Sequence, residues 1–274
     1  MAEACPLGWS LVHLDMEGGV VSSGGSYHLM TSDARWSRRA RVDLLCGLGI
    51  LASGSYATVL VDSFVGPRGQ AVCGLVLGAV TVGWLILRES TLVRAQVAIA
   101  ALLACAVEVA ATQWLGLWDY RLGGLPGWLP SQQANTFLMV LVVARSLPPR
   151  LPDRLLLGCA VFGVGLWTAA NLLLSQRTDT ASVIWFLVLL ALCRHRQTAA
   201  WIPTIVVLTV PLDILVTRTG LLAYRPHDVT GLLLIGEQPS AIVGGYAFIY
   251  YCALRTAPAL LRLWRRSVPQ ARVG

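Results

Sequence analysis

The chain contains no lysine, because all 21 of its basic residues are arginine. Without a lysine amine the protein forms no Schiff base, which excludes retinal bound in the rhodopsin manner. A P-loop is excluded as well, because its lysine contacts the nucleotide phosphates. The four histidines are scattered, and they are too few for the histidine boxes of membrane desaturases and hydroxylases. The seven cysteines lie singly, without a CxxC pair, which is typical of apolar packing. We therefore expect no metal site and no cofactor.

Charged residues are also scarce, at 13% of the chain against about a quarter in soluble domains. The 274 residues are 56% hydrophobic with a mean hydropathy of +0.66, which indicates an integral membrane protein. A membrane-spanning helix needs roughly 20 apolar residues. Apolar runs recur at 43–62, 69–87, 93–115, 133–149, 154–174, 180–193, 201–217 and 240–261. The sequence predicts an all-α polytopic membrane helix bundle of about eight transmembrane helices.

The distribution of arginine predicts the orientation of these helices. With the N-terminus in the cytoplasm, clusters such as 35–41, 145–154 and 262–272 fall in inner segments, and five arginines remain outside: Arg68, Arg121, Arg177, Arg218 and Arg225. This asymmetry follows the positive-inside rule. We expect a multi-pass protein of the cell membrane with both termini in the cytoplasm. The net charge of +7 then sets topology and indicates no nucleic-acid partner.

The first 34 residues are rich in glycine and serine and only weakly apolar, without the pattern of a signal peptide. They are predicted to form a disordered tail, and Met30 is an alternative start because it leads directly into the first arginine cluster. Residues 267–274 are predicted to form a cytoplasmic tail.

One short motif occurs twice in the chain. Gly116-Leu117-Trp118-Asp119-Tyr120-Arg121 reappears as Gly220-Leu221-Leu222-Ala223-Tyr224-Arg225, an offset of 104. Each copy follows an acid by about two helical turns and precedes a glycine-bearing loop that ends in Pro-Ser. This pattern favours two repeats of four helices, 35–150 and 151–266, which are parallel because each has an even number of spans. The alternative is chance similarity among residues common at membrane interfaces.

Two acids occupy equivalent places within the predicted helices. Glu108 precedes Gly116 by eight residues and Asp213 precedes Gly220 by seven, which puts both roughly 10–12 Å below the outer loop. A charged residue at a helix centre costs roughly 2.5–3.5 kcal/mol, so it normally faces the bundle interior. Two carboxyls in one apolar cavity share a proton, which supplies one acid and one base. The alternative is that they hydrogen-bond Gln113, Thr112, Thr217 or a backbone group and only fix helix packing.

Other residues accompany this pair. Glu237 stands just before Pro239, where its carboxyl either interacts with the next helix N-terminus or lines the cavity. Asp43 and Glu89 lie beside arginines at inner helix ends and are expected to form ion pairs. Aromatic rings gather on the outer side, where they form an interfacial belt or shelter a carbocation: Trp114, Trp118, Tyr120, Trp128, Tyr224, Tyr246, Tyr250 and Tyr251. No aspartate-rich segment is present to hold magnesium and a diphosphate, so ionisation of a diphosphate is not expected.

The paired pattern of an acid, Gly-x-Trp-x-Tyr, a glycine-containing loop and a helix-opening proline resembles the membrane lycopene cyclase domain of the heterodimeric type. It resembles in particular forms in which two such units are fused in one chain. The repeat layout covers residues 43–262, and the motifs lie in 108–133 and 213–246. The resemblance implies a multi-helix membrane enzyme that closes ionone-type rings by protonation, cyclisation and proton loss, without net redox change.

The chain departs from the Pro-x-Glu-Glu segment of that family. It reads Pro130-Ser131-Gln132-Gln133 in the first repeat and Pro239-Ser240-Ala241-Ile242 in the second. An amide orients a substrate but delivers no proton, so the catalytic candidates are Asp213, Glu108 and Glu237. The substrate-binding candidates are Gln132, Gln133, Gln113, Trp114, Trp118, Tyr120, Tyr224, Tyr246 and Tyr250.

We therefore expect a membrane terpenoid or carotenoid cyclase of the lyase or isomerase type. It would act on a lipid-soluble isoprenoid polyene, epoxide or prenylated compound, with membrane lipids around it. Addition of water in place of proton loss would make the same site a hydratase. The alternatives are a non-catalytic isoprenoid- or carotenoid-binding membrane subunit and a small proton-coupled transporter. The sequence predicts no particular oligomeric state.

Overall fold

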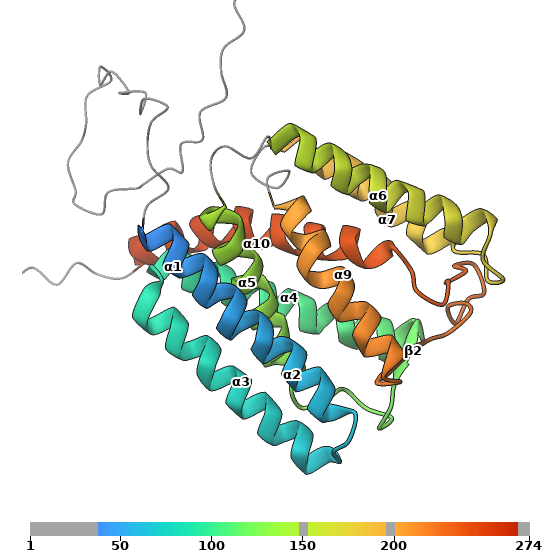
Figure 1. Cartoon of the computed structure of the whole chain (residues 1–274), viewed down its shortest axis with the longest axis horizontal. Helices are drawn as coiled ribbons and strands as arrows, with labels where there is room; N and C mark the ends of the chain where they lie inside the picture. The colour runs from blue at the N-terminus through green and yellow to red at the C-terminus, as the bar shows by residue number, and fades with distance from the viewer. Residues whose placement is uncertain (1–37, 148–152, 196–200, 268–274) are drawn as a thin grey trace, which may run out of the picture. The chain divides into compact units, whose positions relative to one another are not determined.

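Helices account for most of the computed structural model, which describes residues 38–147, 153–195 and 201–267 (Figure 1). Each of the eight predicted apolar runs overlaps a helical segment. The elements in chain order are α1 (Arg38–Cys46), the π-helix η1 (Gly47–Ala52), α2 (Ser53–Asp62), α3 (Pro67–Arg88), α4 (Thr91–Val109), the π-helix η2 (Ala110–Trp114), β1 (Trp118–Tyr120), α5 (Leu129–Ser146), α6 (Asp153–Leu173), α7 (Thr180–Leu192), α9 (Ile202–Arg218), β2 (Leu222–Tyr224) and α10 (Ala241–Ser267). The two short strands and the π-helices were not predicted. The predicted tail 1–34 and the repeat boundary at 150–151 lie outside the described residues.

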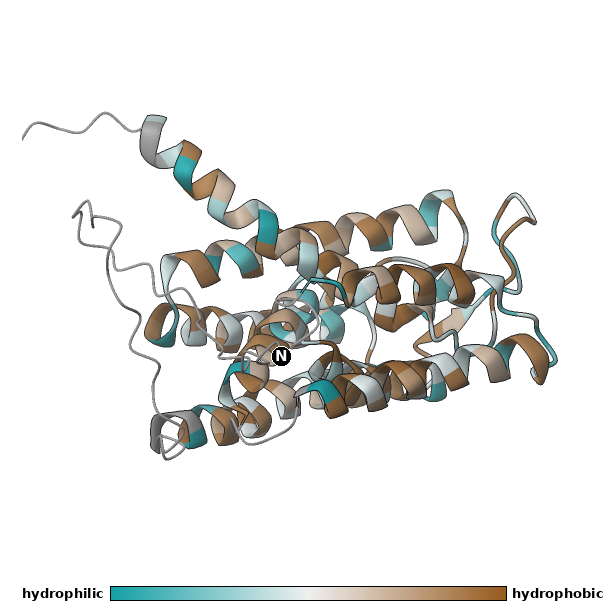
Figure 2. Ribbon diagram, turned by 90° about the horizontal axis from the view of Figure 1, so that it is seen from above, coloured by the Kyte–Doolittle hydropathy of each residue, from teal (hydrophilic) through white to brown (hydrophobic). Residues whose placement is uncertain are grey.

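Four helical segments in the described part of the chain are long and apolar enough to cross a membrane: Arg41–Asp62, Pro67–Arg88, Thr91–Trp114 and Arg154–Leu173. The helices are coloured mainly as hydrophobic in Figure 2. Large apolar side chains such as Leu75, Leu87 and Phe162 are exposed along α3 and α6. Their exposure is favourable where the surrounding solvent is lipid. The fold therefore fits a membrane protein.

The centre of the bundle is α5, whose residues Phe137 to Val143 are all buried. A helix that is apolar on every side belongs in the middle of a bundle. It packs against α1, α3, α4 and α9, whereas α10 packs against α4, α7 and α9. One hydrophobic cluster includes Leu51 and Val97 together with Ile202 and Val243. The first and second halves of the chain thus share one core.

A buried polar network joins the first helices to α5. The Asn135 amide donates to the Leu51 carbonyl oxygen at 2.8 Å and to Ser55 Oγ at 2.7 Å, and accepts a bond from Thr81 Oγ1 at 3.1 Å. Leu51 lies in the π-helix η1. Without these partners the buried amide would be costly in an apolar interior, so the network fixes how α2 and α3 pack on α5.

The predicted ion pairs at the inner helix ends are confirmed. Arg145 forms two hydrogen bonds with the buried Glu89 carboxylate, which also accepts a bond from Trp84 Nε1 at 3.0 Å. Arg88 pairs with Asp43 at 3.3 Å. A bidentate guanidinium and a third donor compensate the desolvation of Glu89, so these carboxyls have a structural role.

The contact between α7 and α10 leaves no room for a side chain at Gly244. A Cβ there would overlap the Trp185 carbonyl oxygen, whereas a Cβ on the neighbouring Gly245 meets nothing within 4 Å. We expect Gly244→Ala to lower the free energy of unfolding by about 1–3 kcal/mol through overpacking. Gly245→Ala, the matched control, should be neutral or stabilising by about 0.5–1 kcal/mol. Thermal melting of both variants in detergent checks this, and equal melting temperatures would contradict it.

Candidate functional site

Both copies of the motif end a helix in the same way. Gly116 and Gly220 have φ values of +61° and +70°, a left-handed conformation that glycine adopts without strain. In the second copy, Gly220 N–H bonds to the Thr217 carbonyl and Leu221 N–H to the Val216 carbonyl, a Schellman cap. The glycine turns the chain sharply, so the strand that follows runs back toward its own helix.

The two motifs then pair with each other. β1 and β2 form an antiparallel ladder in which Trp118 faces Tyr224, Asp119 faces Ala223 and Tyr120 faces Leu222. Arg225 closes the ladder with two 2.7 Å hydrogen bonds to Asp119. This pairing, between segments far apart in sequence, brings the two predicted acid sites to one end of the bundle.

The Glu108 carboxyl accepts three hydrogen bonds. Tyr120 Oη donates to Oε2 at 2.8 Å, Trp118 Nε1 donates to the same oxygen at 3.1 Å, and Gln133 Nε2 donates to Oε1 at 3.2 Å. The donors come from β1 and from the first turns of α5. Three donors around one carboxyl stabilise a negative charge on it.

The Asp213 carboxyl is buried but has far fewer partners. Tyr224 Oη donates to Oδ1 at 3.0 Å, while Oδ2 is buried without a hydrogen bond. The two missing donors correspond to sequence differences between the copies. Trp118 aligns with Leu222, and Gln133 aligns with Ile242 when the two Pro-Ser pairs are superposed. Neither replacement carries a side-chain donor, so Asp213 has one side-chain donor where Glu108 has three.

The spacing from acid to glycine differs by one residue between the copies, and η2 accounts for the difference. In this π-helix, Leu115 N–H bonds to the Ala110 carbonyl, five residues back. An i→i+5 turn holds one more residue than an α-helical turn. Each tyrosine therefore reaches the acid of its own copy, although eight residues separate Glu108 from Gly116 and seven separate Asp213 from Gly220.

The surroundings of the acids are aromatic. The rings of Trp118 and Tyr224 meet edge to face at 5.8 Å. Both carboxyls act electrostatically on Tyr224 and on Tyr246 of α10, and Tyr246 also interacts with Gln133. Burial, followed by the nearby carboxyls, raises the pKa of Tyr120 and of Tyr224 well above the usual value of 10. Both phenols on the strands thus remain protonated and act as donors.

Seven of the predicted site residues gather in this cluster: Glu108, Asp213, Gln133, Trp118, Tyr120, Tyr224 and Tyr246. Tyr250 is buried one turn further along α10, with its ring 5.9 Å from Tyr246, and its hydroxyl lacks a hydrogen bond. Gln132 is buried on α5, where it donates to Thr136.

Three predicted residues do not join the cluster. Gln113 and Trp114 are exposed on η2, and Trp114 has 71% of its surface exposed. Five and six residues after Glu108, neither residue lies on the helix face that carries this acid. Glu237 is exposed in the loop before α10, without a hydrogen bond or ion pair among the described residues. Within the described residues no hydrogen bond joins Gln113 to either acid. Thr112 and Thr217 donate to the backbone carbonyls of Glu108 and Asp213 and not to their carboxyls, and Thr217 also bonds to the Ile214 carbonyl and accepts a bond from Gln238.

Sequence reasoning did not identify Asp119 or Asp179. Asp119 holds Arg225 across the ladder, and the duplicated Tyr-Arg ending was the available signal. Asp179 is buried, caps α7 through Ser182 and accepts a bond from Asn171 of α6 at 3.3 Å. Within the described residues no group of three or more His, Cys, Asp or Glu side chains is placed to hold a metal ion.

No protein-family model matches the chain, and comparison with curated proteins and with solved structures found no match.

The Asp119–Arg225 pair makes the ladder sensitive to acid. The hydrogen bonds from Arg225 hold the pKa of Asp119 below its usual value. The pair therefore contributes stability above the ordinary aspartate pKa of about 3.9, and this contribution is lost as the pH falls through the lowered value. We expect Asp119→Asn to lower the melting temperature at pH 6 and to lower it by less at pH 3. If the variant and the wild type differed in melting temperature by the same amount at both pH values, the expectation would be contradicted.

Proposed function

We propose that the chain crosses the membrane eight times, as two parallel four-helix repeats related by a pseudo-twofold axis. The β1–β2 register supports this, because the pairing is symmetric about Asp119 and Ala223, which are equivalent residues of the two motifs. Packing agrees with the same axis: α4 contacts α10 and α9 contacts α5, so the third helix of each repeat meets the fourth helix of the other. The arginine distribution then supports a multi-pass location in the cell membrane with both termini in the cytoplasm.

The repeat proposal predicts the effect of single-residue deletions. Deleting the exposed Gln113 shortens the first spacing to that of the second copy, so η2 should become an α-helical turn and the Tyr120–Glu108 bond should persist. Deleting the exposed Arg218 leaves one residue too few in α9 and should pull Tyr224 away from Asp213. We expect the first deletion to change the melting temperature by a few degrees, and the second to cause a much larger loss.

An Arg218→Gln substitution controls for the lost charge. Equal destabilisation by the two deletions would contradict the proposal that the π-helical turn accommodates the extra residue.

We propose further that the protein is a membrane cyclase that acts on a lipid-soluble isoprenoid, such as a polyene, an epoxide or a prenylated compound. The observation that carries the proposal is the unequal hydrogen bonding of Asp213 and Glu108 within one aromatic cluster. A protonated carboxyl and an ionised carboxyl close together are what an acid-initiated cyclisation needs. Aromatic faces stabilise the intermediate cation.

The proposed reaction begins with proton transfer from Asp213 to a terminal double bond or to an epoxide oxygen. The π electrons of that double bond form the new C–H bond, or the epoxide C–O bond breaks, and a carbocation results. An internal double bond attacks the cation and closes the ring. Glu108 then removes a proton from a neighbouring carbon, and the C–H electrons form the final double bond. The product is an isomer of the substrate, so no oxidant or reductant is consumed.

This proposal assigns Gln133 a different role from the substrate-binding role expected of it, whereas Gln132 keeps that role. Gln133 occupies the position of the last acid in the Pro-x-Glu-Glu segment of the lycopene cyclase domain that the sequence resembles. In this chain the Gln133 amide donates to Glu108. We propose that Gln133 orients the base, and that Gln132, whose Oε1 is buried without a hydrogen bond, faces the substrate. Tyr224, Tyr246 and Trp118 would line the path of the cation.

The second candidate is a non-catalytic isoprenoid-binding subunit. The observation in its favour is the pair of amides at Gln132 and Gln133, which orient a ligand but deliver no proton. A binding subunit retains its ligand unchanged, whereas the cyclase returns a ring-closed isomer of equal mass. A proton-coupled transporter would instead show pH-driven uptake into vesicles.

Membranes that contain the protein can be incubated with lycopene, geranylgeranylated quinols and their epoxides, followed by chromatography and mass spectrometry of the products. We expect Asp213→Asn and Glu108→Gln each to lower ring formation by about 100-fold or more, as for loss of a general acid or base. The matched control is Asp43→Asn, the same chemical change at the inner helix end, where activity should persist. Normal turnover in both site variants at equal membrane abundance would refute the assignment.

A further inference from the structure

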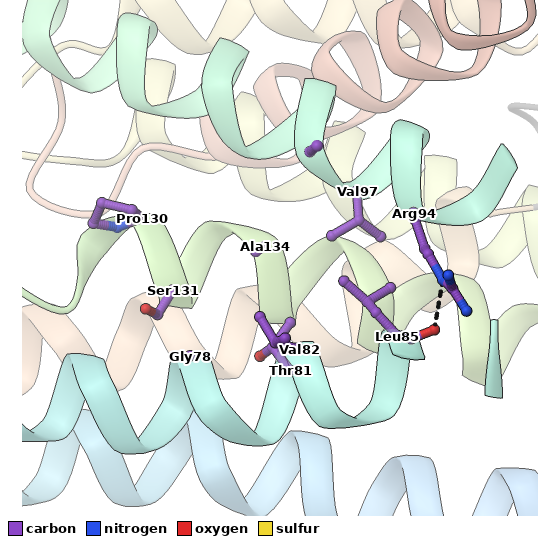
Figure 3. A pocket seen from close by; sticks show the side chains of 10 residues that line it. Gly78, Thr81, Val82, Leu85, Arg94, Val97, Pro130, Ser131 and Ala134 are labelled. Atoms are coloured by element: carbon purple, nitrogen blue, oxygen red, sulfur yellow. Dashed lines mark hydrogen bonds between the residues drawn. The ribbon is translucent and has the colours of Figure 1, made fainter. Parts of the chain in front are cut away.

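A groove opens between α3 and α4, lined also by the first turns of α5. Both helices pack along α5 but make few contacts with each other, although only Glu89 and Ser90 separate them in sequence. The groove has a volume of about 250 Å³. Figure 3 shows Val82 of α3 and Val97 of α4 on its walls, with Ala134 of α5 at its floor. Its surface is predominantly apolar, as an acyl chain requires.

One cation lies at the end of this groove. Arg94 donates from Nε to the Leu85 carbonyl oxygen and from Nη2 to the Ile86 carbonyl oxygen, both at 3.0 Å. These carbonyls belong to the last turn of α3, and the Leu85 oxygen also accepts a bond from Glu89 N–H at 3.2 Å. The two bonds hold the guanidinium across the opening between α3 and α4.

The Arg94 guanidinium still has donors to offer. A guanidinium has five N–H groups, of which two are used here, and the remaining edge matches the geometry of a phosphate. No acidic side chain pairs with Arg94 in the described ranges 38–147, 153–195 and 201–267. The neighbouring Arg88 differs, because Asp43 neutralises it. An oriented and uncompensated cation thus stands at one end of an apolar groove.

We propose that this groove binds one acyl chain of an anionic phospholipid, with its phosphate on the Arg94 guanidinium. The ligand must be apolar along the groove and negatively charged at the end of the groove, and a phospholipid of the surrounding bilayer has both properties. Holding the guanidinium in advance reduces the conformational entropy lost when the lipid binds. The site is independent of the acid pair, so it stands or fails separately from the proposed cyclase.

The test is native mass spectrometry of the detergent-purified protein with phosphatidylglycerol and phosphatidylcholine of identical chains. The wild type should retain phosphatidylglycerol in preference to phosphatidylcholine. Arg94→Gln should weaken phosphatidylglycerol retention about fivefold, the effect of one basic residue at an anionic headgroup. Arg88→Gln removes the same charge from an arginine that is paired with Asp43. Its retention of phosphatidylglycerol should remain within about twofold of the wild type.

A second variant leaves Arg94 and its bonds to α3 unchanged. Ala98→Phe fills the groove and should also weaken retention of phosphatidylglycerol, so the proposal remains testable if Arg94→Gln fails to fold. Equal retention of the two lipids by the wild type would overturn the proposal. Unchanged binding of phosphatidylglycerol in Ala98→Phe would also overturn it. So would equal losses in Arg94→Gln and Arg88→Gln, because a general effect of net charge would then explain both.

Discussion

A carboxyl inside an apolar helix bundle has to be satisfied by donors, and this requirement connects most of the observed structure. Neither α4 nor α9 supplies a donor to the acid that it carries. In both copies the tyrosine donor comes from the segment that follows the helix. This segment reverses direction at a left-handed glycine, which brings the phenol back to the acid. The reversed segments pair as β1 and β2, which links the two halves of the chain. The position of each acid, the helix end and the strand register therefore depend on one another.

The helices could be predicted because a run of apolar residues has few alternatives to a helix in a membrane. Glu108 and Asp213 were predictable for the same reason, since an acid in such a run is costly and stands out. The donors were not predictable from spacing. β1 has three residues, and its partner lies about a hundred residues away, so only the folded chain shows which side chains meet. The π-helical turn was also hidden, because a shift from i→i+4 to i→i+5 leaves no mark in the hydropathy pattern. Gln113 and Trp114 were included because they are close to Glu108 in sequence, and closeness in sequence does not show that both are exposed.

The two copies share a left-handed glycine and a paired strand, but they differ in the number of donors around the acid. Glycine, tyrosine and arginine occupy the same places in both motifs, and they set the turn, the phenol and the strand end. Among the positions that differ are two donors to Glu108, since Trp118 and Gln133 correspond to Leu222 and Ile242. These differences remove two donors from the second copy and leave one oxygen of Asp213 without a partner. Under the proposed repeat arrangement, two equivalent positions with different donors produce a site with two unlike carboxyls.

Under the proposed reaction, the unequal protonation of the two carboxyls also keeps the net charge of the site constant at every step. At rest the pair has one proton, so its net charge is −1. When Asp213 gives up its proton, two carboxylates and one carbocation again sum to −1, and after Glu108 takes a proton the total is unchanged. A change of net charge is costly in an apolar interior, whereas a shift of charge between fixed neighbours is not. The tyrosine and tryptophan donors are already directed at the carboxyls before reaction, so little reorganisation is needed as charge moves. A site of this kind favours a cation that forms and disappears between the two acids over one that escapes to the lipid.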